Sequence, residues 1–146
     1  MSQNPKYSEH QETLIALVTH LAMTDWSARS PTNISKAISI DKHEIITVLE
    51  SFKGLFRKGK RVNKKTNENY YSLQIRHARQ WLEDTDADDE ESKKPPLEPE
   101  YLNKLLDFVI TKAAEERSNK IAVFGPWLTA AASLVVAALA IIFKNS

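Results

Sequence analysis

The feature that constrains this chain most is a run without ionisable side chains close to its C-terminal end. Residues 121–143, IAVFGPWLTAAASLVVAALAIIF, lie between Lys120 and Lys144 and contain no charged residue. A membrane-spanning helix needs about 20 predominantly apolar residues, so the run predicts a single transmembrane helix followed by a short tail, residues 144–146. A buried core helix is the alternative, but a small domain has too little surface to cover one of this length.

The flanks of this run predict its orientation. Lys112, Arg117 and Lys120 precede it, whereas Lys144 alone follows. The excess of basic residues on the cytoplasmic side of membrane helices places the N-terminal part in the cytoplasm. The first residues are polar and lack the apolar core of a signal peptide. We therefore expect a tail-anchored, single-pass membrane protein with a cytoplasmic N-terminal domain.

Small residues recur at every fourth position of the predicted span, a spacing that lets two membrane helices approach closely. The row consists of Gly125, Thr129, Ser133 and Ala137. It predicts membrane-helix packing between copies, although an Ala-rich helix also produces such rows by chance.

The near-zero net charge of +1 hides three segments of different sign. Residues 1–82 carry a net +6, residues 83–100 a net −7 and residues 101–146 a net +2. A uniform globular domain is therefore not expected. We predict an N-terminal domain over residues 1–82 and an acidic flexible linker over residues 83–98, because the linker has too little apolar surface to offset the entropy of ordering it.

Residues 99–120 form a predicted amphipathic stalk helix that continues into the transmembrane helix. Its apolar stripe needs a partner, which can be another copy, a second protein or the membrane interface. We expect a homodimer or higher homo-oligomer through residues 98–137. The stripe consists of Leu102, Leu105, Leu106, Val109, Ile110 and Ala113.

Composition excludes several kinds of site. With no Cys, the chain has no disulfide, thiolate nucleophile, zinc ribbon or iron–sulfur cluster. Three Gly residues are too few for a glycine-rich phosphate loop. The four His residues lack metal-ligand spacing, and no Ser/His/Asp arrangement has supporting context. We therefore predict no catalytic residues, no metal site and no cofactor; the protein is not expected to be an enzyme.

The N-terminal domain reads as three helices followed by a hairpin. Apolar residues at helical spacing predict a helix over 9–23 and a short one over 31–38. A third helix begins after Asp41, which forms a capping-box pattern with Glu44, and ends at Lys53-Gly54. Two strands, 55–62 and 68–75, then flank a polar turn. The residues expected to face inward are Leu14, Leu17, Val18, Leu21, Ile34, Ala37, Ile38, Ile45, Val48, Leu49 and Phe52.

The stretch from Asn33 to Leu73 resembles the winged helix-turn-helix fold, in the MarR-like style of bacterial regulators. The matching features are the short helix ISKAI, the capped helix from Asp41, the KGLF stop before the hairpin and the returning strand YYSL. The resemblance implies nucleic-acid binding, with the third helix entering a major groove and the hairpin, called the wing, touching the backbone or minor groove.

Carried over to this sequence, the third helix offers Lys42, His43, Ile46 and Thr47 as outward positions. The wing offers six cations, which would form a salt-dependent phosphate footprint; a merely solvated hairpin is the alternative. These cations are Arg57, Lys58, Lys60, Arg61, Lys64 and Lys65.

The third helix departs from a base-reading pattern. It is slightly acidic and has no Arg, Asn or Gln, the usual bidentate readers of base edges. An exposed Ile46 would suit a protein contact better. Two functions therefore remain open. The first is a membrane-anchored DNA-binding regulator or DNA–membrane tether that contacts DNA, with lipid as a further partner. The second is a protein-interaction module of a membrane effector or sensor, for example in bacterial stress or phage defence.

Overall fold

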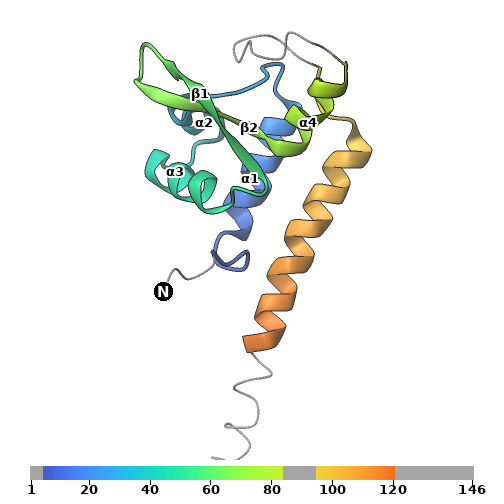
Figure 1. The fold of residues 1–146 in the computed structure, drawn as a ribbon. Coiled ribbons are helices and arrows are strands. Elements are labelled where there is room, and N and C mark those ends of the chain that lie inside the picture. The colour runs from blue at the N-terminus through green and yellow to red at the C-terminus, as the bar shows by residue number, and fades with distance from the viewer. Residues whose placement is uncertain (1–4, 84–94, 121–146) are drawn as a thin grey trace, which may run out of the picture.

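The computed structural model describes residues 5–83 and 95–120, which form a small helical head with a two-stranded hairpin and one long helix along its side (Figure 1). We call α1 to α4 with the hairpin the head. The elements in chain order are α1 (Gln11–Met23), α2 (Pro31–Ile38), α3 (Lys42–Ser51), β1 (Phe56–Asn63), β2 (Glu68–Leu73), α4 (Gln74–Glu83) and a helix over residues 99–120.

The core lies between the first three helices, as the apolar spacing predicts. Each helix contributes a buried stripe because residues three and four apart share one face of a helix. Ala37, predicted to face inward, is exposed instead, and Ile38 is half-buried. The fully or nearly fully buried side chains of this core are Leu14, Leu17, Val18, Leu21, Ile34, Ile45, Val48 and Leu49.

The start of α2, the end of α2 and the end of α3 are each set by different residues. Pro31 starts α2, where its missing N–H would be unpaired in any case. Ser39 ends α2 in the left-handed conformation, with φ 56°. The predicted stop at Lys53-Gly54 is only partly right: α3 ends at Ser51 with Phe52 as its C-cap, and Gly54 does not adopt a positive φ.

The hairpin is antiparallel and irregular in the middle. Phe56 pairs with Leu73 and Lys58 with Tyr71, but the next pair is Val62 with Asn69. Three β1 residues therefore face a single β2 residue, which makes a β-bulge. Such bulges bend a strand and redirect its side chains. On the far side of β2, Arg29 forms an isolated bridge with Tyr71 through backbone hydrogen bonds of 2.9 and 2.8 Å.

A fourth helix, α4, follows β2 directly and is absent from the sequence prediction, which extends the strand to residue 75. Its Arg76 is 4% exposed and reaches three backbone carbonyls. The guanidinium donates to Leu21 O at 2.9 Å, to Trp26 O at 3.1 Å and to Pro95 O at 2.9 Å. Burial lowers the pKa of Arg76, and the nearby Asp25 carboxylate partly offsets this effect.

The helix over residues 99–120 packs against the head. Its entry is fixed by the Leu97 N–H, which donates to Ala22 O at the end of α1 (2.8 Å). Val109 and Ala113 are fully buried, and Leu97 joins the same core. At its other end Glu116 accepts hydrogen bonds from the backbone N–H groups of Tyr7 (3.1 Å) and Ser8 (2.8 Å).

The predicted stripe of this helix is therefore covered largely by its own chain. Leu102, Leu105 and Leu106 are half-buried against the core cluster, whereas Ile110 is 45% exposed. Aromatic contacts join this helix to the N-terminal turn and to the residue after α3. The centroid of the Tyr7 ring lies 4.8 Å from that of Phe52 and 5.7 Å from that of Phe108. Self-association through residues 98–137 stays a prediction, but most of the stripe already has a partner.

The predicted fold class and localisation require correction at the membrane helix. Across residues 5–83 and 95–120, no helix has both the length and the hydropathy to cross a bilayer. This finding contradicts a stalk helix that continues into a single transmembrane helix, and it contradicts the single-pass localisation with a cytoplasmic N-terminal domain. The physical reason lies in the 99–120 helix, whose outer face is charged and whose apolar face packs on the head.

Several sequence predictions fall outside the described residues. The span over 121–143, its row of Gly125, Thr129, Ser133 and Ala137, and the tail 144–146 lie there. So does most of the predicted acidic linker, residues 84–94.

Candidate nucleic-acid interface

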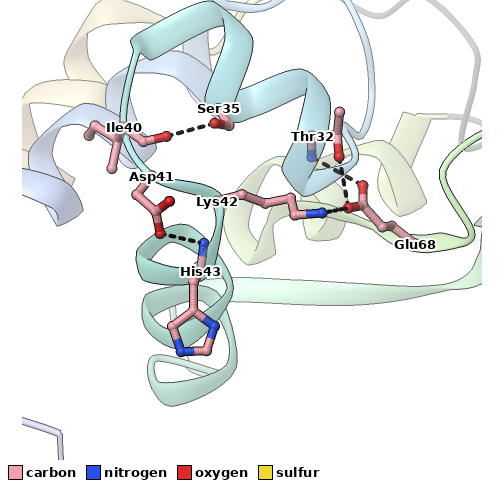
Figure 2. Close-up of polar contacts among 7 residues, drawn as sticks. All are labelled: Thr32, Ser35, Ile40, Asp41, Lys42, His43 and Glu68. Carbon is pink, nitrogen blue, oxygen red and sulfur yellow. Dashed lines mark hydrogen bonds and ion pairs between the residues drawn. The ribbon is translucent and has the colours of Figure 1, made fainter.

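The start of α3 is organised by side-chain hydrogen bonds to the backbone (Figure 2). The Asp41 carboxylate accepts from the N–H groups of His43 (2.8 Å) and Glu44 (3.2 Å), which confirms the predicted cap. The Ser35 hydroxyl donates to Ile40 O at 2.7 Å and closes the turn between α2 and α3. Glu44 does not complete a capping box with Asp41; its carboxylate accepts from the hydroxyl of Thr13 on α1.

Glu68, the first residue of β2, joins three elements at this point (Figure 2). Its carboxylate accepts from the Thr32 N–H (3.1 Å) and hydroxyl (2.8 Å) at the start of α2. It also forms an ion pair with Lys42 of α3, N to O 3.1 Å. Burial raises the pKa of Glu68, but the hydrogen bonds from Thr32 and Lys42 outweigh it, so the pKa lies below its ordinary value.

A second carboxylate, Glu50 near the end of α3, ties that helix to the wing. It pairs with Lys58 of β1 at 2.7 Å and accepts a hydrogen bond from the Tyr71 hydroxyl of β2. The Lys58 nitrogen also lies 6.0 Å from the Tyr71 ring centroid. The Lys58 hydrogen bond lowers the pKa of Glu50, whereas burial and Glu50 raise the pKa of Tyr71.

The outer part of the wing carries the remaining cations. Lys60 and Arg61 lie within the bulge, and both are exposed. The Asn69 side-chain amide donates to Gly59 O at 3.0 Å, which fixes the irregular backbone there. Lys64 and Lys65 are exposed in the turn, where the Lys65 N–H donates to the Asn63 side chain (2.9 Å).

The other predicted contact residues lie in different surroundings. His43 and Thr47 are exposed on α3, and the Thr47 hydroxyl donates to His43 O at 2.9 Å. Ile46, predicted to be exposed, is half-buried. Arg57 is half-buried at the base of the wing, with its Nη1 atom 3.5 Å from Nδ1 of His77 in α4.

The structure therefore divides the predicted contact set into two groups. Lys42 and Lys58 form ion pairs with Glu68 and Glu50, and a second group, Lys60, Arg61, Lys64 and Lys65, is exposed on the outer wing. Sequence reasoning missed the roles of Glu50 and Glu68, because no local pattern places either one next to a lysine eight or twenty-six residues away. Within the described part of the chain, no cluster of three metal-ligating side chains occurs.

Comparison with known protein families, with curated proteins and with solved structures gives no match for this chain.

Proposed function

We propose that this protein binds double-stranded DNA as a winged helix-turn-helix module, mainly through phosphate contacts from the outer wing. The observation that carries the proposal is the exposure of four cations on one bulged hairpin, Lys60, Arg61, Lys64 and Lys65. Exposed Lys and Arg side chains gathered on a protruding element are the electrostatic footprint of nucleic-acid binding.

The order of elements supports the winged helix-turn-helix reading. Two short helices, α2 and α3, meet at a tight turn closed by Ser35 and Asp41, and the hairpin follows α3. The wing is held to α3 through Glu50 and to the start of α2 through Glu68. A hairpin fixed in this way presents its cations at a defined place relative to α3.

Sequence-specific readout is not part of this proposal. Base edges in the major groove are read mostly by Arg, Asn and Gln side chains, and α3 contains none of them. The exposed side chains near its start are Asp41, Lys42, His43 and Glu44, which carry a net charge of −1 when His43 is neutral. Contacts to phosphate position a protein on DNA without carrying sequence information, and we expect this behaviour here.

The test removes the four outer cations from the full-length chain. We expect K60Q/R61Q/K64Q/K65Q to lose most of its affinity for a 20-base-pair duplex of arbitrary sequence, measured by fluorescence anisotropy. The plot of log affinity against log salt should become shallower by about 3 to 4, because each phosphate contact contributes about 0.9 to the slope.

A matched control carries the same charge loss on the 99–120 helix. K104Q/K112Q/R117Q/K120Q also removes four exposed or half-exposed cations, and we expect it to keep most of the wild-type affinity. Equal losses in the two quadruple variants would show that only net charge matters. A wild-type chain that binds no duplex at low salt would rule out DNA as the partner.

A second function, a protein-interaction module, is favoured by a different surface. An open cleft of about 650 Å³ lies between the end of α1, the following loop and the end of α2. It is lined by Met23 and Trp26, which are 50% and 37% exposed. Exposed large apolar side chains that gather in one cleft are typical of protein contacts. Under this alternative, M23S/W26S would abolish partner binding and the quadruple wing variant would not.

A further inference from the structure

Two of the cations at the candidate interface form ion pairs with carboxylates of the same chain. Lys42 pairs with Glu68 across 3.1 Å, and Lys58 pairs with Glu50 across 2.7 Å. Both lysines remain about half exposed, with side-chain exposures of 51% and 50%. A phosphate could therefore reach either ammonium group, but it would have to compete with a carboxylate already in place.

These pairs differ from the ordinary ion pairs of the surface. The Glu68 side chain is 13% exposed and is also held by Thr32, and Glu50 is also held by the Tyr71 hydroxyl. The Glu100–Lys104 pair of the 99–120 helix joins two side chains that are 72% and 67% exposed. Exposed pairs of that kind contribute little to stability, because holding two long side chains in place costs entropy. Glu50 and Glu68 are instead positioned by further hydrogen bonds from other elements.

We propose that Glu50 and Glu68 set the DNA affinity of the interface by holding Lys58 and Lys42 in internal ion pairs. This inference rests on the proposed DNA-binding function. The two carboxylates weaken the phosphate contacts of Lys42 and Lys58 and keep the α3 side of the interface near electrical neutrality. Binding is then weaker than the number of cations suggests, and it is set by residues that touch no DNA.

Both carboxylates stay ionised at neutral pH. The Lys58 hydrogen bond, with that from Tyr71, keeps the pKa of Glu50 below its ordinary value. Burial acts in the opposite direction on Glu68, but the Thr32 and Lys42 hydrogen bonds leave its pKa lowered as well. Two further charges act on these groups. The positive charge of Lys53 helps to lower the pKa of Glu50, and the negative charge of Glu68 helps to raise the pKa of Tyr71.

The test compares E50Q and E68Q with E100Q in the full-length chain. All three variants remove one negative charge and one partner of a lysine, but only the first two lie at the interface. We expect E50Q and E68Q each to bind the arbitrary 20-base-pair duplex about three- to tenfold more tightly at low salt. Each should also steepen the salt dependence by about 0.9, since one more cation reaches a phosphate.

A double-mutant cycle shows whether the gain passes through the freed lysine. We expect K58Q alone to weaken binding, because it leaves the ionised Glu50 carboxylate without its lysine, and E50Q/K58Q to lose the gain of E50Q. The corresponding pair for the second site is K42Q and E68Q/K42Q. Gln keeps the size of Glu and can still accept from Tyr71 or Thr32, and thermal unfolding of each variant checks that it is folded.

The outcomes separate this inference from the function on which it rests. Wild-type binding with E50Q and E68Q indistinguishable from E100Q would overturn the inference and leave DNA binding intact. A gain in E50Q that survives in E50Q/K58Q would also overturn it, because the gain would then not pass through Lys58. No binding by any variant would overturn the proposed function itself. If E68Q does not fold, the Glu50 cycle alone decides.

Discussion

At the residue scale, Arg76 joins α4 to the end of α1 and to the segment before the 99–120 helix. It is 4% exposed and donates to carbonyls of α1, of the following loop and of the segment that leads into the 99–120 helix. A buried carbonyl without a donor costs about 1–3 kcal/mol. The single guanidinium on α4 therefore fixes residues 21–26 and Pro95, two segments far apart in sequence, relative to each other.

We expect Arg76→Met to lower the free energy of unfolding by about 2–4 kcal/mol, because the carbonyls lose their donor while the side-chain volume is roughly kept. Urea unfolding of the full-length chain measures the change. The control is Arg117→Met, since Arg117 is exposed and its replacement should cost less than about 0.5 kcal/mol. Equal costs for the two variants would refute the anchoring role.

The role of a single residue could be predicted from the sequence where its hydrogen-bond partner lies a few residues away. Asp41 caps α3 as predicted, because an N-cap needs only N–H groups two and three residues away. Glu44 shows the limit of such reasoning. Its spacing from Asp41 matches a capping box, but in the folded chain its carboxylate accepts from the hydroxyl of Thr13 on α1.

At the element scale, the 99–120 helix shows how an amphipathic pattern leaves its partner undefined. The apolar stripe was correctly recognised, but the head covers most of it. Ala113 is fully buried and Ala114, the next residue, is exposed. These two alanines give a direct test of the docked arrangement.

We expect Ala113→Glu to destabilise the protein by at least about 3 kcal/mol, because it places a charge against the core without a partner. Ala114→Glu adds the same side chain to the same helix but points to solvent, and should change stability by less than about 0.5 kcal/mol. Chemical unfolding of both variants supplies the comparison. A free stalk would make them equal.

The hairpin and α4 illustrate two further limits at this scale. The strands over 55–62 and 68–75 were placed within two residues of the observed ends, since turn and β-branched or aromatic residues mark them. The bulge between Lys58 and Val62 has no comparable signature. The helix α4 was missed because Ile75 continues the alternating pattern of β2, while the Gln74 N–H instead donates to Leu55 O (2.9 Å).

At the scale of the whole molecule, three carboxylates connect elements by accepting hydrogen bonds from residues distant in sequence. Glu68 joins β2 to α2 and α3, Glu50 joins α3 to the wing, and Glu116 joins the 99–120 helix to the N-terminal turn. Burial raises the pKa of Glu116, but the N–H groups of Ser8 and Tyr7 outweigh it and leave the pKa lowered. All three carboxylates therefore favour the folded state in their ionised form.

Stability should fall as the pH drops below about 4.5, the ordinary Glu value. In this range the unfolded chain binds more protons than the folded chain, because the pKa values are lower in the folded state. The free energy of unfolding therefore rises with pH, and the stabilisation is fully present above the unfolded pKa. We expect E116Q to be about 1 kcal/mol less stable than wild type at pH 7. The gap should narrow as the pH falls below the ordinary Glu value, because a protonated Glu116 resembles Gln.

Urea unfolding of wild type and E116Q at pH 7, 5 and 3 measures this dependence. E115Q is the control, because Glu115 is exposed and pairs with Lys112 on its own helix. A gap between wild type and E116Q that stays constant with pH would contradict the proposed role of the ionised carboxylate.

The sequence by itself determined the buried faces of α1 and α3, the cap at Asp41, the hairpin and the basic character of the wing. Each depends on residues a few positions apart, and periodicity or turn chemistry records them directly. Only the tertiary structure decided which cations face carboxylates, where Arg76 binds and what covers the 99–120 helix. Those outcomes depend on distances between elements remote in sequence, and no local pattern contains them.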